Sequence, residues 1–214
     1  MLITEPDVTL TDYGLAVECA VFTHLLARDA HREPIGAWFL LFFAATGLAA
    51  LTGGTVHGFF ADERTLGSRI LWPATLLLIG GAAFAAWGLG AHLQFPARVA
   101  RWVVLAAAAG LAGYAVVVLF VSQLFLVAVL YYLPATVFLI TVFALGYRRG
   151  GQRAFLLGLV ALVLTLIASG IQQGRIALHP AYFNHNALQH LVQGIALFVL
   201  FRSARRLVSG HVRS

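Results

Sequence analysis

The chain has 214 residues, of which 61% are hydrophobic and only 10% are charged. A soluble domain of ordinary composition carries about 25% charged residues, so this composition excludes that class and indicates a polytopic membrane protein. The net charge of +6 reflects 14 arginines, with no lysine in the chain. Because basic residues in membrane proteins mostly set topology, we expect no nucleic-acid partner. The single cysteine excludes a disulfide framework within one chain.

Seven apolar segments approach or exceed the length of about 20 residues that a helix needs to cross a bilayer. In chain order they cover residues 12–28, 36–60, 70–93, 102–121, 124–146, 154–173 and 184–203. Charged residues, Gly or Pro separate most neighbours, whereas only Ser122 and Gln123 separate the fourth segment from the fifth. The sequence therefore predicts an all-α, seven-transmembrane-helix bundle that forms a single integral membrane domain over residues 1–214.

The arginines predict the orientation of this bundle. Eleven of the 14 fall in connections one–two, three–four and five–six and in the C-terminal tail, whereas Arg64, Arg69 and Arg175 lie on the opposite side. The positive-inside rule then places the N-terminus outside and the C-terminus in the cytoplasm. The absence of lysine and the abundance of alanine and glycine suggest a GC-rich bacterial genome, so we expect a multi-pass protein of the bacterial inner membrane.

An unusual polar string, Asn184-His185-Asn186-Ala187-Leu188-Gln189-His190, begins the last apolar segment. Amides and imidazoles are costly within a membrane and mark a functional-site hypothesis. We expect His57 in the second segment and Glu18 in the first to lie at about the same depth as this string. The first segment runs inward from Asp12, and Glu18 lies about 9 Å below Asp12 by helical rise. We therefore expect a polar pocket of His, Asn and Glu side chains in the outer third of the bundle.

Helical periodicity divides this string between two faces. His185 and His190 are five residues apart, which places them about 140° apart around the helix axis. Asn186, His190 and Gln193 share one stripe, which we expect to face the interior. His185 then lies nearer the rim, and Asn184 is the predicted N-cap.

The residue types in the pocket favour metal-dependent hydrolysis. Imidazole is a common zinc ligand, and a carboxylate can complete a site beside an activated water, so we expect a zinc-bound hydroxide to attack a lipid amide or ester. The amides would orient the ligands. The predicted metal ligands are His57 and His190, with His185 or Glu18 as the third, and the predicted catalytic residues are Glu18, Asn186 and Gln193.

Two other functions fit the same residues. In the first, the protein is a non-enzymatic membrane sensor or partner subunit, and His57 and His190 hydrogen-bond across helices as structural groups. In the second, the protein is a haem-binding electron carrier. Its axial ligands would be an outer pair, His57 and His190, and an inner pair, His24 and His92. Membrane lipid is the expected partner, and glycines four residues apart, as in residues 54–58 and 170–174, permit a homo-oligomer.

Seven spans, with His57 near the end of the second and His185 and His190 at the start of the seventh, resemble the CREST superfamily of alkaline ceramidases and progestin-and-adipoQ receptors. Its members carry Ser-xxx-His in span two, Asp in span three and His-xxx-His in span seven around zinc. The resemblance implies an intramembrane zinc amidase acting on lipids. Here Gly53 replaces the serine, span three has no acid, and an amide replaces one histidine of span seven. The polar string at the start of the seventh segment also looks like that of uncharacterised bacterial seven-span proteins.

Overall fold

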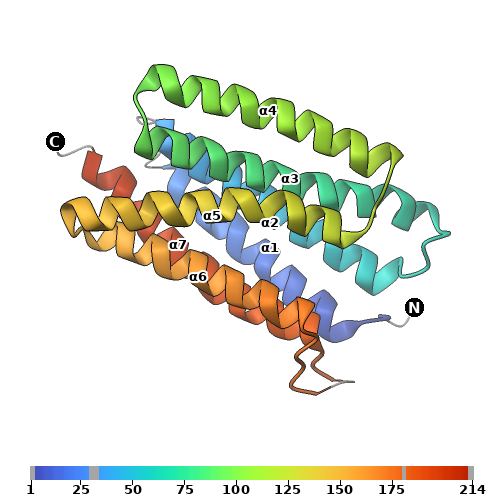
Figure 1. Cartoon of the computed structure of the whole chain (residues 1–214). Coiled ribbons are helices and arrows are strands. Elements are labelled where there is room, and N and C mark those ends of the chain that lie inside the picture. Colours follow the sequence, from blue (N-terminus) through green and yellow to red (C-terminus); the bar gives the residue numbers. More distant parts are fainter. Residues whose placement is uncertain (1–2, 29–33, 180–181, 212–214) are drawn as a thin grey trace.

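The computed structural model describes residues 3–28, 34–179 and 182–211 (Figure 1). These residues form seven helices: α1 (Pro6–Ala27), α2 (Pro34–Phe59), α3 (Leu66–Gln94), α4 (Ala97–Phe120), α5 (Phe125–Gly150), α6 (Arg153–Gln173) and α7 (His185–His211). The described part contains no strand beyond an isolated bridge between His179 and Phe183. The predicted all-α class is confirmed, and each predicted apolar segment overlaps one helix. Two of the eleven arginines on the expected cytoplasmic side, Arg32 and Arg213, lie outside the described residues.

Five of the described helices, α2 to α6, are long and apolar enough to cross a membrane. This is the composition of a multi-pass membrane protein. Helix α1 is more polar, because it carries Asp7, Asp12 and Glu18. It also begins at Pro6, six residues earlier than the predicted segment. The early start places Asp12 within the helix, where it is buried.

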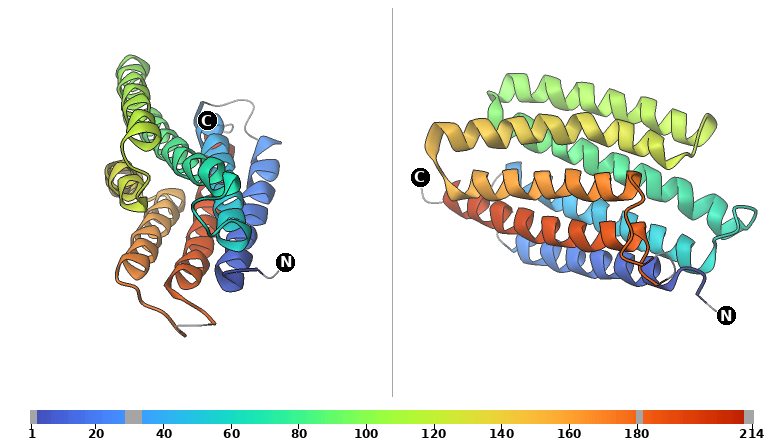
Figure 2. Two further views of the ribbon diagram at one scale, coloured as in Figure 1. Left: turned by 90° about the vertical axis from the view of Figure 1, so that its right-hand side faces the viewer. Right: turned by 60° about the horizontal axis from the view of Figure 1, so that its bottom comes forward.

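Six helices form a closed ring, and one lies outside it. Neighbours pack in the order α1, α2, α3, α5, α6, α7 and back to α1, and α4 packs on α3 (Figures 1 and 2). Tyr114 of α4 also stacks on Tyr131 of α5, with 4.2 Å between ring centroids. Helix α1 is therefore a direct neighbour of both α2 and α7.

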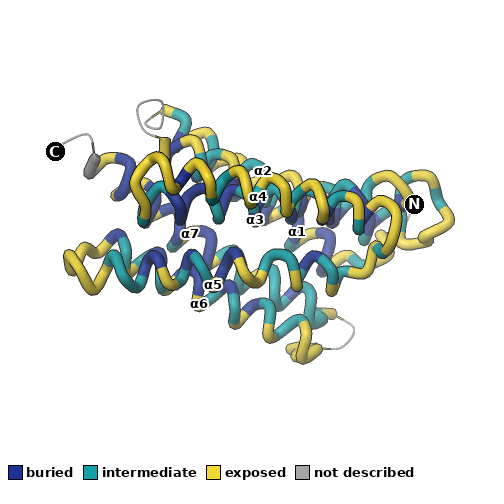
Figure 3. Tube along the Cα trace, turned by 45° about the horizontal axis from the view of Figure 1, so that its top comes forward, coloured by how far each residue is buried: buried dark blue, intermediate teal, exposed yellow. Residues whose placement is uncertain are grey.

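Aromatic side chains fill the ring toward the end where α7 finishes. Phe22 of α1 stacks on Phe201 of α7 at 4.3 Å between centroids and meets Phe43 of α2 edge-on at 5.5 Å. The outward faces are mostly exposed, and α4 is exposed along most of its length (Figure 3). Because α4 is apolar all round yet little buried, its surface suits hydrocarbon better than water.

The weakest predicted helix break is confirmed. Helix α4 ends at Phe120 and α5 begins at Phe125. The indole N–H of Trp72 on α3 donates to the backbone carbonyl of Gln123, 2.9 Å away, and so fixes the turn. This contact places α4 and α5 antiparallel beside α3.

Candidate functional site

The start of α7 is fixed by α1. The side-chain oxygen of Asn184 accepts hydrogen bonds from the backbone N–H groups of Asn186 and Ala187 at 2.8 and 3.1 Å. The predicted N-cap is therefore confirmed. The backbone N–H of Asn184 itself donates to the Asp7 carboxylate at 2.9 Å. The first turn of α1 thus determines where α7 begins.

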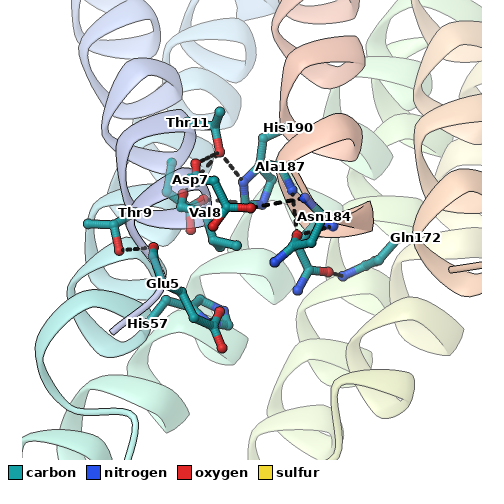
Figure 4. Close-up of polar contacts among 12 residues, drawn as sticks. Glu5, Asp7, Val8, Thr9, Thr11, His57, Gln172, Asn184, Ala187 and His190 are labelled. Atoms are coloured by element: carbon teal, nitrogen blue, oxygen red, sulfur yellow. Dashed lines mark hydrogen bonds and ion pairs between the residues drawn. The ribbon is translucent and has the colours of Figure 1, made fainter. Parts of the chain in front are cut away.

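His190 of α7 contacts two side chains of α1, Thr11 and Asp12, and its contact with Thr11 can be followed in Figure 4. Its Nε2 is 3.3 Å from Oδ1 of Asp12, and its Nδ1 is 3.1 Å from the Thr11 hydroxyl. The side chains of His190 and Asp12 are only 13% and 8% exposed. A buried acid–imidazole pair therefore joins α1 to α7, and both ring nitrogens of His190 already have polar neighbours.

The neighbours of the Thr11 hydroxyl indicate which ring nitrogen of His190 carries a hydrogen. The Thr11 hydroxyl lies 2.8 Å from the carbonyl of Asp7 and 3.0 Å from that of Val8. A hydroxyl has one hydrogen, and carbonyls only accept, so donation to either carbonyl leaves the Thr11 oxygen to accept from Nδ1–H of His190. The bond between His190 and Asp12 then requires a further proton between Nε2 and the carboxylate.

His57 pairs with the residue that precedes α1. Its Nδ1 is 2.9 Å from Oε2 of Glu5, and the two side chains are 29% and 40% exposed. The backbone N–H of Thr4 donates to the carbonyl of Gly58 at 3.1 Å, which holds the same segment against the end of α2. This second acid–imidazole pair is more open to solvent than the first.

The structure gives two of the three predicted metal ligands, His57 and His190, separate partners. Within residues 3–28, 34–179 and 182–211, no group of three or more His, Cys, Asp or Glu side chains is placed to hold a metal ion. The Glu18 carboxylate faces Gly194 of α7, where an added Cβ would lie 3.2 Å from Oε2. Among the described residues, His185 has no side-chain hydrogen bond or ion pair. Zinc and haem binding stay predictions.

The predicted stripe on α7 faces two neighbouring helices. The Gln172 amide of α6 donates to Asn186 at 3.3 Å, and the Gln193 amide donates to Thr165 of α6 at 3.3 Å. His190, on the same stripe, instead contacts α1. The two predicted catalytic amides therefore lie on the side of α7 that faces α6, away from the acid–imidazole pair.

A cavity of about 170 Å³ lies beside these amides, between α2, α3, α5, α6 and α7. None of the described residues that line it is charged. The α2 and α3 wall is mainly apolar and includes Phe42, Ala49, Ile79 and Ala82. The α6 and α7 wall is polar and contains Thr165, Ser169, Gln172, Gln189 and Gln193. The cavity is thus a neutral, two-sided site.

Comparison with known proteins gives a family but no activity. No curated protein and no solved structure matches the chain, and nothing found links it to the CREST superfamily. A family model described as a family of unknown function, DUF6962, matches residues 8–209. That range reaches from the first turn of α1 almost to the end of α7. The chain therefore belongs to the DUF6962 family.

Proposed function

We propose that this is a seven-span protein of the bacterial inner membrane that binds a small uncharged ligand and acts as a sensor or partner subunit. Its N-terminus would lie outside and its C-terminus in the cytoplasm. The arginine distribution supports this orientation. Helices α1 and α7 complete the ring formed with α2, α3, α5 and α6, which supports counting them as spans.

The chemistry of the cavity carries the proposal. Among the described residues, the side chains of Ser169 and Gln189 have no hydrogen-bond partner, and both line the cavity. A polar group in apolar surroundings costs roughly 1–3 kcal/mol when it has no partner. Ligand sites commonly join apolar walls to a few convergent polar groups. A ligand with one hydrogen-bonding end would satisfy these two side chains.

The histidines support a structural role in this proposal. His57 and His190 are each paired with a carboxylate of the α1 segment. A metal at His190 would have to displace Thr11 or Asp12, because both ring nitrogens are engaged. Ser169 has no titratable neighbour among the residues of the cavity wall except Tyr132. The wall therefore offers binding groups rather than a nucleophile with its base.

Photolabelling in detergent tests the proposal. Purified protein is equilibrated with a diazirine analogue of a long-chain primary alcohol, irradiated, and mapped by mass spectrometry. Labelled peptides should come from α5, α6 and α7. Ala49→Phe fills the cavity from α2 and should abolish labelling, whereas Ala112→Phe on the exposed face of α4 should not. Equal labelling of both variants, with both eluting as folded protein, would contradict ligand binding in the cavity.

A further inference from the structure

Residues of both α5 and α6 line the cavity. These helices are joined by Gly151 and Gln152 and separate toward their other ends (Figure 1). Leu133 of α5 lines the cavity and is nevertheless 42% exposed. Leu166, a half-buried residue of α6, lines it as well. One side chain therefore touches both the cavity and the surroundings, which locates the mouth at Leu133.

The surface around this mouth is apolar. Leu130 and Val137 of α5 and Val163 and Ile167 of α6 are all exposed. Such a surface in a membrane protein faces hydrocarbon rather than water. A ligand that arrives through this mouth must therefore come from the bilayer.

The size of the cavity limits how much of a ligand it can enclose. A cavity of about 150 Å³ holds a molecule of the size of benzene. The present cavity of about 170 Å³ therefore accommodates a head group and the first few carbons of a chain. The remainder of a long molecule must lie in the mouth beside Leu133.

The polar wall selects the head group. Gln172 and Gln193 are already hydrogen-bonded to Asn186 and Thr165. On the wall formed by α6 and α7, Ser169 and Gln189 have no such partner among the described residues. With no charged residue among the described wall, an ionised carboxylate or phosphate would be buried without a counter-charge, which is strongly unfavourable. A hydroxyl or amide head would form hydrogen bonds at little cost.

We infer that the cavity takes a single-chain amphiphile with an uncharged hydrogen-bonding head directly from the bilayer, through a lateral portal between α5 and α6. The head contacts Ser169 and Gln189, and the chain passes Leu133. This inference rests on the proposed ligand-binding function and adds the ligand class and the route of entry.

A reversible plug in the portal tests the route. Cys19 is buried, so a cysteine placed at Leu133 is the accessible thiol and can carry a bulky thiosulfonate reagent that a reductant removes. Leu105→Cys, on the exposed face of α4 and absent from the cavity wall, is the matched control. In phosphatidylcholine nanodiscs, the plug at position 133 should slow labelling by the diazirine alcohol at least about tenfold. Reductant should restore the rate, and the plug at position 105 should leave it unchanged.

The outcomes separate the two proposals. Equal rates for plugs at positions 133 and 105 would overturn the portal, while labelling in detergent would still support the cavity. Absence of labelling in detergent would overturn the cavity itself. Competition tests the ligand class, because an unlabelled long-chain alcohol should displace the probe and the ionised fatty acid of the same length should not. Equal competition by the fatty acid anion would overturn the assignment of an uncharged head.

Discussion

Gly54 determines whether Asp12 can be buried between α1 and α2. An added Cβ at Gly54 would lie 2.7 Å from Cβ of Asp12 and 3.3 Å from the ring of Tyr13. Carbon atoms pack at about 3.5–4.0 Å, so the two helices would have to separate by about 1 Å. Overpacking of this kind costs about 1–3 kcal/mol, whereas alanine gains up to about 1 kcal/mol over glycine in a helix. We expect Gly54→Ala to be destabilising by about 1–2 kcal/mol.

Gly53 supplies the matched control for this prediction. An added Cβ at Gly53 would lie 3.4 Å from Thr75 and 3.7 Å from the Asp12 carboxylate, both ordinary contacts. Gly53→Ala should therefore be neutral or slightly stabilising. Unfolding midpoints in a mixed-micelle SDS titration measure both variants. Equal midpoints for the two would refute the argument that close contact between α1 and α2 at Gly54 permits the burial of Asp12.

Four further predictions follow from the polar contacts of α1 and α7. His190→Ala should cost about 1–3 kcal/mol, because it leaves the buried Asp12 carboxyl without its hydrogen-bond partner, whereas His57→Ala should cost about 0–1 kcal/mol, because its pair with Glu5 is more exposed. The reverse order of unfolding midpoints would contradict the burial difference. Asn184→Ala should cost about 1 kcal/mol through loss of the N-cap, seen in the same titration. Nitrogen-15 spectra should show His190 protonated at Nδ1, and an unprotonated Nδ1 would contradict the role given to Thr11. Metal analysis of purified protein should find no stoichiometric zinc, and stoichiometric zinc lost in a His57→Ala, His190→Ala double variant would restore the hydrolase hypothesis.

The helices were predictable because their ends carry strong local signals. Pro96 precedes α4, and Gly151, with a positive φ of 61°, ends α5. Pro134, within α5, does not end that helix. The predicted first segment begins at the polar residue Asp12, whereas α1 begins at Pro6 and contains Asp12. Pro6 is the signal that could have corrected it, since proline favours the first turn of a helix.

The partners of the histidines were harder to predict than their depth. Spacing along one helix shows which residues share a face, but a broad face can meet two neighbours. On α7, His190 meets α1 and Gln193 meets α6. The pairing of Asp12 with His190 depends on how α1 packs against α2 and α7, which spacing along one helix does not show. The cavity depends on the side-chain volumes of five helices. The sequence of one segment does not show which side chains of the other helices face it.

The contacts of α1 also change where function should be sought. Asp7, Asp12 and Glu5 already pair with Asn184, His190 and His57. The groups that first suggested chemistry are thus largely satisfied within the protein itself. Ser169 and Gln189 have no such partner among the described residues, although they line a mainly apolar cavity. Because an unpaired polar group is costly there unless something binds it, these two neutral side chains mark the functional wall of the bundle more strongly than the histidines do.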